Sequence, residues 1–247
     1  NNNILSGSMC KMTTLAAKVG NYEIFNFFYP RATRYQLDKM SLWSNACYGG
    51  NLKILEFLKR QYHDLSLGLS QNYTKKPLYQ LVQSLNKETL EIFLQKEGID
   101  LSSLLLSEKI HLMSSVCLNK RKIPPEKHYE FVVYLFDKLK KPDIFDHFYS
   151  GEISSPLFDA ALSGNSEILK FALSHAQKNL SQTQNIKGNT LLHQATFSKN
   201  IESIKLLKKY HFNPTQTNFS FESPISFALS NSEDLTVLYQ FCAKYSI

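Results

Sequence analysis

Hydrophobic residues recur along this chain at three- and four-residue steps, in short segments separated by glycine, asparagine and proline. Residues 52–58, "LKILEFL", place Ile54, Leu55 and Leu58 on one side of a helix. Residues 201–207, "IESIKLL", follow the same pattern. A stripe of this kind predicts a helix with one buried face and one polar face. We therefore expect a series of short amphipathic helices.

The predicted helices come in pairs with recurrent boundary residues. A serine precedes proline at 155–156 and at 223–224, which predicts an N-cap followed by proline at the first helical position. Gly-Asn follows at 20–21, 50–51 and 164–165, where glycine can end one helix in the left-handed region and asparagine can cap the next. Each unit is therefore expected to hold two antiparallel helices and a loop.

The paired unit repeats along nearly the whole chain. Its equivalent positions are Thr14, Ser44, Tyr79, His111, Phe158, His193 and Ser226, spaced by 30, 35, 32, 47, 35 and 33 residues. The repeats span approximately 11–40, 41–75, 76–107, 108–154, 155–189, 190–222 and 223–247, with an insertion near 119–128 in the fourth. A recurring period of this length predicts a stacked array, and we expect a single domain over residues 1–247.

Residues 188–214, "GNTLLHQATFSKNIESIKLLKKYHFNP", resemble an ankyrin repeat, and depart from its pattern at Leu191, Thr196 and Phe212. The resemblance implies an all-α fold, an ankyrin-repeat solenoid of six to seven helix-turn-helix repeats with short hairpin loops. A plain helical-hairpin array without hairpin tips is the alternative, and the long loop at 178–190 argues against it.

The resemblance also implies a structural role for the histidine of the motif. The ring of His193 is expected to hydrogen-bond backbone near the hairpins, and His111 is expected at the same place in the fourth repeat. A buried imidazole needs such partners. Neither histidine has a catalytic partner nearby in sequence.

In ankyrin arrays the hairpin tips and the exposed face of each first helix form a concave groove that binds another protein. This implies partner contacts at Tyr48, Asn72, Tyr73, Lys75, Gln83, Ile186, Lys187, Asn189, Phe197, Ser198, Phe219 and Glu222. The aromatic members are the expected anchors, because aromatic side chains contribute most to interfaces. Of the alternating pair Phe219 and Phe221, one is expected to point inward.

No motif in the sequence predicts catalysis, a cofactor or a metal site. Cys10, Cys47, Cys117 and Cys242 are far apart, and Cys47 occupies a small-residue position that predicts a buried hydrophobe. This usage favours a reducing, cytoplasmic compartment. No signal sequence or membrane span is visible. The chain lacks an initiator methionine, so we expect a fragment of a longer protein, and a binding fragment of a larger enzyme stays an alternative.

The net charge of +7 and pI near 9.1 predict an anionic partner. Arginine, the residue best suited to bidentate phosphate and guanine contacts, occurs only four times among the 28 basic residues. We therefore expect a monomer that binds a protein with an acidic surface, with anionic lipid or nucleic acid as the alternative. In the insertion, Lys120, Arg121, Lys122 and Lys127 form either a protruding basic contact or part of a tolerated surface loop.

The excess of lysine and asparagine over arginine is typical of AT-rich genomes. Ankyrin arrays with such a composition resemble those of effectors from intracellular bacteria and of large DNA viruses. This resemblance implies an action on host proteins in the host cytoplasm.

Overall fold

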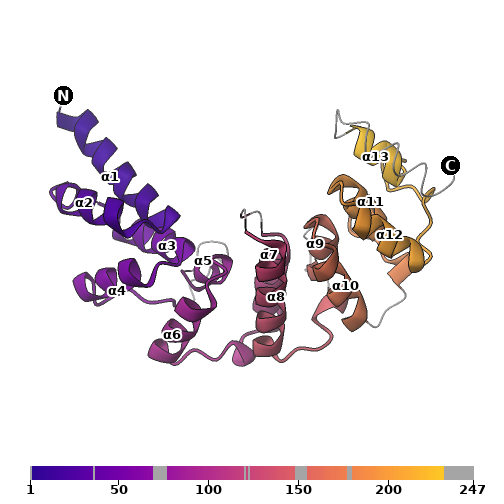
Figure 1. Cartoon of the computed structure of the whole chain (residues 1–247), viewed down its shortest axis with the longest axis horizontal. Coiled ribbons are helices and arrows are strands. Elements are labelled where there is room, and N and C mark those ends of the chain that lie inside the picture. Colours follow the sequence, from indigo (N-terminus) through magenta and orange to yellow (C-terminus); the bar gives the residue numbers. More distant parts are fainter. Residues whose placement is uncertain are drawn as a thin grey trace. The chain divides into compact units, whose positions relative to one another are not determined.

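The computed structural model describes residues 2–35, 37–68, 77–119, 121, 123–147, 155–176 and 180–230, with side chains from Gly7 onward except that of Gln182. Within these residues it has thirteen α-helices and no strand, apart from one isolated antiparallel bridge between Gln184 and Thr190. The chain divides into two compact units, Asn1–Asp100 and Leu101–Ile247 (Figure 1). The all-α expectation is confirmed.

The first unit contains three helix pairs. Their bounds are α1 (Asn2–Val19) with α2 (Tyr22–Ala32), α3 (Lys39–Gly49) with α4 (Leu52–Gln61), and α5 (Pro77–Gln83) with α6 (Lys87–Glu97). The first helices pack in a row, α1 on α3 and α3 on α5, and the second helices α2 and α4 pack beside them. This produces two layers of helices.

The second unit repeats this arrangement. Its helices are α7 (Leu106–Cys117), α8 (Pro125–Leu139), α9 (Pro156–Leu162), α10 (Ser166–His175), α11 (Leu191–Phe197), α12 (Ile201–Lys209) and α13 (Pro224–Ser230), with short 3₁₀ turns η2 (Leu101–Ser103), η3 (Ile144–Asp146) and η4 (Leu180–Gln182). The row of first helices is α7, α9, α11 and α13, and the second helices α8, α10 and α12 form the other layer.

Small and branched side chains fill the space between the layers as the sequence predicts. Ala17, Ala46 and Cys47 on the first helices have no exposed surface, and neither do Ile54 and Leu58 on α4. Small residues allow the first helices to approach closely, while the apolar stripe of each second helix covers the other side of the core.

The Gly-Asn boundaries do more than end one helix and begin the next. Gly20, Gly50 and Gly164 lie in the left-handed region, and each following asparagine caps its helix. The asparagine amide also reaches the preceding repeat. Asn51 Nδ2 donates to the Gly20 carbonyl at 2.8 Å, and the same contact recurs in Asn86 with Gly50 and Asn200 with Gly164. One side chain therefore stabilises a helix start and a joint between repeats.

The first helix of the fourth repeat begins earlier in its repeat than those of the next two repeats. This helix, α7, begins at Leu106, and the Glu108 carboxylate accepts from the Leu105 N–H at 3.1 Å. Glu108 therefore occupies the third helical position of α7, as His193 does in α11. The expected equivalence of His111 with His193 stays a prediction. Helix α7 begins at Leu106, so His111 lies further inside its helix than His193 does, and it is buried there.

The Pro-Pro segment starts the second helix of this repeat as expected. Helix α8 begins at Pro125 and carries Glu126 in its first turn. The neighbouring His128 is buried, and its Nε2 donates to the Val116 carbonyl at 2.7 Å. This bond ties α8 to the end of α7, so the end of the insertion is anchored inside the unit.

We predict that Asn51→Asp destabilises the first unit although aspartate caps helices as well as asparagine does. The substitution keeps the cap acceptor but places a carboxylate against the Gly20 carbonyl in place of a donor. An unsatisfied pair of this kind costs about 1–3 kcal/mol. Urea unfolding followed by the fluorescence of Trp43, the only tryptophan and fully buried in this unit, measures the change.

The reverse substitution Asp38→Asn is the matched control. Asp38 caps α3 through its carboxylate, which accepts from Met40 and Ser41 N–H groups. An equal loss of stability in both variants would show that the cap alone matters and would contradict a role for the bond between repeats.

Candidate functional site

Two hairpins of the second unit are built on the same local plan. The side chain of Asn185 accepts hydrogen bonds from the N–H groups of Lys187 and Asn189, both at 3.0 Å. Asn218 accepts in the same way from Ser220 at 2.9 Å and Glu222 at 3.0 Å. In each hairpin one buried asparagine therefore holds four following residues in a tight turn.

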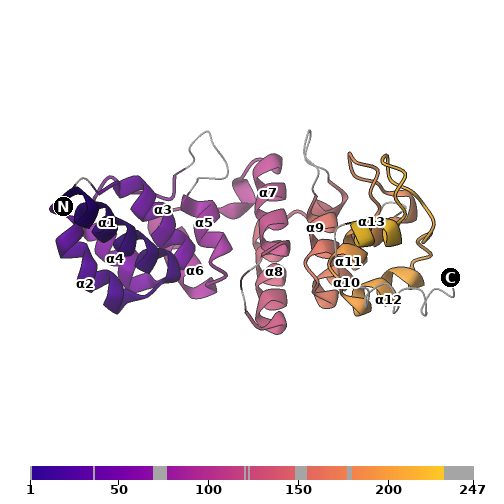
Figure 2. The same cartoon turned by 90° about the horizontal axis from the view of Figure 1, so that it is seen from above.

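The two hairpins, residues 185–189 and 218–222, lie side by side beyond the first helices (Figure 2). Asn218 Nδ2 donates to Asn189 Oδ1 at 2.8 Å, and the Phe219 N–H donates to the Lys187 carbonyl at 3.0 Å. These bonds connect one hairpin to the other through side chain and backbone. The tips are therefore fixed relative to each other.

His193 anchors the second hairpin, as the resemblance implied. Its Nε2 donates to the Glu222 carbonyl at 3.0 Å, so Nδ1 is the acceptor and takes hydrogen bonds from the N–H and hydroxyl of Thr190 at 3.1 and 2.9 Å. The ring has no exposed surface. Both nitrogens are committed to structure, which leaves none for proton transfer.

Large apolar side chains are exposed on this rigid frame. The exposed fractions are 56% for Ile186, 69% for Phe219, 88% for Phe221 and 41% for Phe197. The expectation that one of Phe219 and Phe221 points inward is wrong. Alternation between two faces holds for a strand, whereas these residues lie in a turn in which Phe221 has a φ of 60°.

Gly188 is required for the position of Phe219. A Cβ at Gly188 would lie 2.6 Å from a ring carbon of Phe219 and 2.7 Å from its backbone nitrogen. The ring edge therefore rests on the first hairpin while most of the side chain faces solvent.

Several other predicted partner contacts of this unit are buried or take part in hydrogen bonds within the unit. Asn189 is 2% exposed, so it has almost no surface to offer a partner. The Glu222 carboxylate accepts from Asn218 Nδ2 at 3.1 Å and from the Ser230 hydroxyl at 2.9 Å, and these bonds hold its pKa below the ordinary value. Ser198 donates to the Ala195 carbonyl at 2.8 Å. Lys187 is exposed at the first tip.

In the first unit, the predicted contacts that the structure describes lie on first helices. Tyr48 is half-buried near the end of α3 with the Lys18 ammonium 5.6 Å from its ring centroid, and Gln83 is half-buried at the end of α5. The neighbouring Gly49 packs against α1, since a Cβ there would lie 2.0 Å from the Ala17 carbonyl oxygen. The predicted tip contacts Asn72, Tyr73 and Lys75 lie outside the described residues.

The predicted basic contact of the insertion is described only in part. Lys120 and Lys122 lie outside the described residues. Arg121 is half-buried, and its N–H donates to Asn119 Oδ1 at 2.8 Å, while Lys127 is exposed in the first turn of α8. The described part therefore presents one exposed lysine and one partly covered arginine.

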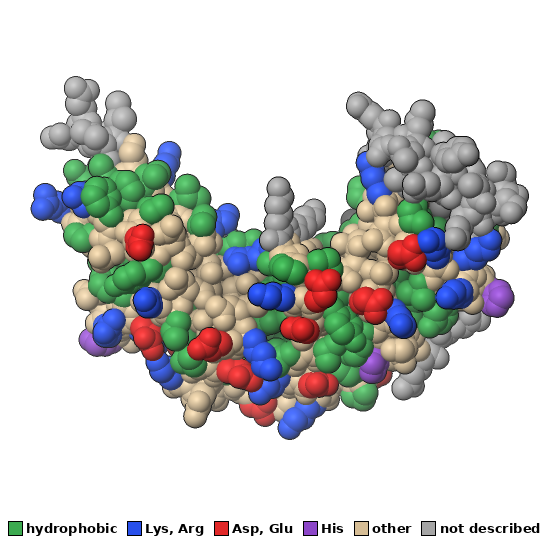
Figure 3. Space-filling model, viewed as in Figure 1, with side chains coloured by type: hydrophobic (Ala, Val, Ile, Leu, Met, Phe, Trp, Pro, Cys, Tyr) green, Lys and Arg blue, Asp and Glu red, His purple; other side chains and the backbone are tan. Residues whose placement is uncertain are grey.

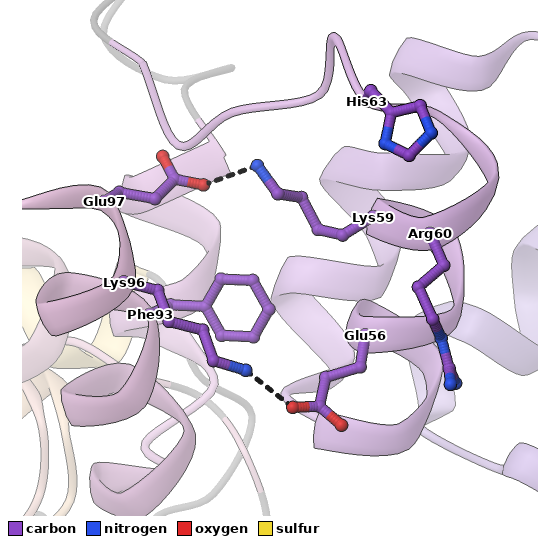
Figure 4. A pocket seen from close by; sticks show the side chains of 7 residues that line it. All are labelled: Glu56, Lys59, Arg60, His63, Phe93, Lys96 and Glu97. Atoms are coloured by element: carbon purple, nitrogen blue, oxygen red, sulfur yellow. Dashed lines mark hydrogen bonds and ion pairs between the residues drawn. The ribbon is translucent and has the colours of Figure 1, made fainter.

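Charged side chains of both signs lie over the second helices on the face shown in Figure 3. In the first unit, α4 and α6 enclose a cleft with a cavity volume of about 390 Å³. Two ion pairs cross it on either side of the Phe93 ring, Lys59 with Glu97 at 3.1 Å and Lys96 with Glu56 at 2.7 Å (Figure 4). The carboxylates here are committed to cations.

Glu97 also reaches the loop that follows α4, where its second oxygen accepts the Leu67 N–H at 2.7 Å.

Burial raises the pKa of the thiols of Cys47 and Cys117, so both are protonated thiols and poor nucleophiles. Within the described residues no group of three or more His, Cys, Asp or Glu side chains could hold a metal ion.

Phe221, the most exposed of the large apolar side chains on the two hairpins, was not among the predicted partner contacts. Its exposure depends on the turn that Asn218 fixes. The signal was the repeated Asn-x-x-x-Asn/Glu spacing at 185–189 and 218–222, which places one asparagine at the start of each tip.

Comparisons with known proteins agree with this geometry. Residues 125–218 match the family model for ankyrin repeats (3 copies). The crystal structure of the human ASB11 ankyrin repeat domain is similar at a TM-score of 0.57 and 16% identity, covering 94% of this chain and 96% of that one. No curated protein sequence matches the chain. None of the described helices combines the length and hydropathy needed to cross a bilayer.

We predict that the second unit loses stability as pH falls below about 6.5. Burial lowers the pKa of both His193 and His128 below their ordinary value of 6.5. Below that pH the unfolded chain binds protons that the folded chain does not, so protonation favours unfolding. The free energy of unfolding, measured by urea titration with circular dichroism between pH 7.5 and 5, should decrease as pH decreases.

Substitution separates this effect from general acid sensitivity. His193→Gln should cost about 2–4 kcal/mol at pH 7.5, because hairpin and cap groups lose their partners, and it should have a shallower decline between pH 6.5 and 5. His211→Asn, at an exposed position with left-handed φ, is the control and should keep the native slope. An unchanged slope in the His193 variant would contradict the assignment.

Proposed function

The chain is an ankyrin-repeat protein, and on that premise we propose that it is a non-catalytic scaffold that binds a partner protein through its hairpin tips and first helices. Ankyrin repeats are generally protein interaction modules. The observation that supports this function best is the set of exposed apolar side chains held on two cross-linked hairpins and at the end of α11. We call this set the tip surface, defined by Ile186, Phe197, Phe219 and Phe221.

The tip surface suits binding because its frame is ordered before a partner arrives. The asparagine side chains and His193 fix the turns, so little backbone freedom is lost on association. Rings that are more than half exposed have unburied area to offer, and aromatic side chains lose few rotamers. Lys187 beside them adds a positive charge at the rim. These properties favour a partner with an apolar patch bordered by acidic residues.

A non-catalytic role is supported by the structural use of the side chains that could act in catalysis. Both nitrogens of His193 are hydrogen-bonded to structure, and Cys47 and Cys117 are buried thiols. The carboxylates that line the α4 and α6 cleft are paired with lysines. We propose that the protein acts as a monomer, because its apolar tips are dispersed over two hairpins and one helix.

The composition supports a further part of the proposal, an action inside a host cell. Lysine outnumbers arginine as in the effectors of intracellular bacteria and in viral ankyrin proteins. Such a role places the partner among host proteins in a reducing compartment. Immunodetection in fractionated infected cells tests it, and confinement of the protein to the producing cell would contradict it.

We predict that Phe219→Ser with Phe221→Ser abolishes capture of the partner. Truncating a central aromatic in an interface costs about 2 kcal/mol or more, so each substitution weakens binding by roughly thirtyfold. Photo-crosslinking in cell lysate, followed by mass spectrometry, compares the native protein with the double variant. Proteins crosslinked only by the native form are the candidates, and their affinity for both forms is then measured with purified material.

Phe27→Ser is the matched control for this experiment. Phe27 is 55% exposed on α2 of the first unit and is not part of the tip surface. It should retain the native set of crosslinked proteins. If the tip variant and the control both keep that set, the tip surface is not the binding surface.

A further inference from the structure

The second helices α10 and α12 enclose an open cleft on a different layer from the tip surface. Its cavity volume is about 540 Å³, within the range of about 300–1,000 Å³ that small-ligand pockets occupy. Lys170 lines it from α10, and Lys205, Lys208 and Lys209 line it from α12. Only two carboxylates, those of Glu167 and Glu202, accompany these four lysines.

The charges in this cleft are incompletely balanced. Glu202 pairs with Lys205, its neighbour on the same helix. Lys170 and Lys209 are exposed and make no ion pair with the described part of the chain. The cleft therefore holds at least two lysines whose charge is not paired by the described residues of the second unit.

The equivalent cleft of the first unit provides an internal comparison. Between α4 and α6 each cation that crosses the cleft meets a carboxylate on the opposite helix, as Lys96 does with Glu56. Those pairs bridge neighbouring repeats. At this place in the array the chain itself can therefore pair most of the cations of a cleft, with Arg60 as a further cation in the lining.

Counting from the N-cap asparagine of each helix identifies equivalent positions in the two clefts. The fifth residue after the cap is Glu56 in α4 and Lys170 in α10. On the opposite helix, the fifth residue after the cap is Glu91 in α6 and Lys205 in α12. Acidic residues of the first unit are thus replaced by lysines at both positions. Lys205 is paired with Glu202, whereas Lys170 on α10 and Lys209 on α12 bring two like charges to the same cleft. Like charges repel, and neutralisation by an anion relieves the repulsion.

We propose that the cleft between α10 and α12 binds an acidic segment of a partner protein, an extended stretch rich in Asp and Glu. Lysine ammonium groups are flexible point charges, which suits several carboxylates spaced along a peptide. Leu206 lines the cleft and gives its floor an apolar part that a peptide side chain can cover. Lys208 and Lys209 also lie in the last turn of α12, where the helix dipole favours cations.

The chemistry of the cleft favours a peptide over other polyanions. Its lining contains no arginine for bidentate contacts and no aromatic ring on which a base could stack. A bilayer surface is flat, whereas these lysines line a concave cleft between two helices. The site does not depend on the tip surface, which lies on other elements.

Fluorescence anisotropy with a labelled decapeptide of alternating Asp and Glu, blocked at both ends, tests the proposal. The native protein should bind it at about 50 mM salt and lose most of the binding at about 300 mM, since exposed charges are screened. Lys170→Glu with Lys209→Glu should weaken binding at least tenfold. Lys170→Gln with Lys209→Gln should give a smaller loss in the same direction.

The control variant Lys11→Glu with Lys140→Glu makes the same change in net charge at exposed sites outside the cleft. It should bind the peptide within twofold of the native protein. Equal weakening by cleft and control variants would show a response to total charge only and overturn the site. Circular dichroism of each variant confirms the fold.

Competition identifies the class of ligand. Single-stranded DNA and vesicles containing about 30% anionic lipid should displace the peptide weakly. Displacement by either at a lower concentration of anionic groups than the peptide itself would assign the cleft to that ligand and overturn the proposal. Phe219→Ser with Phe221→Ser should leave peptide binding unchanged, so failure of the tip surface and failure of the cleft are read separately.

Discussion

The double use of one asparagine side chain holds the repeats of each unit together. Oδ1 of Asn51 caps α4, and Nδ2 of the same residue donates to the carbonyl of Gly20 in the preceding repeat. The glycine has to be left-handed for its carbonyl to face that amide, and the helix has to begin at the asparagine. The same asparagine therefore fixes both where the second helix begins and how its repeat contacts the preceding one. The same bond recurs at other joints between repeats and helps to form the layers.

In the hairpins of the candidate site, one asparagine side chain again makes two kinds of hydrogen bond. Asn218 uses its oxygen to close its own turn and its amide to reach Asn189 in the neighbouring one. His193 then joins the start of α11 to the end of the second hairpin. Because these buried polar groups satisfy one another, the rings of Phe219 and Phe221 are free to face solvent.

Local rules in the sequence predict much of this fold because each repeat is fixed by short-range signals. The N-caps, the left-handed glycines, the small residues of the first helices and the structural role of His193 all depend on residues within one repeat or its neighbour. Prediction fails where a turn replaces a strand, as at Phe221. Asn189 shows a further limit of prediction from the sequence. Its place in the repeat predicts an exposed contact at the hairpin tip, but the structure buries it as the hydrogen-bond partner of Asn218.

In a repeat array, function is inferred most directly from equivalent positions whose side chains differ in charge or polarity. The residue that caps a second helix has to accept from its first N–H groups, and it is asparagine in α2, α4, α6, α10 and α12. The fifth position after the cap of a second helix is under no such constraint, and it is Glu56 in one unit and Lys170 in the other. The first is used within the chain, in an ion pair with Lys96. The second has no such use within the described residues, and an unbalanced charge beside others of its sign is best explained by something outside the chain that carries the opposite charge.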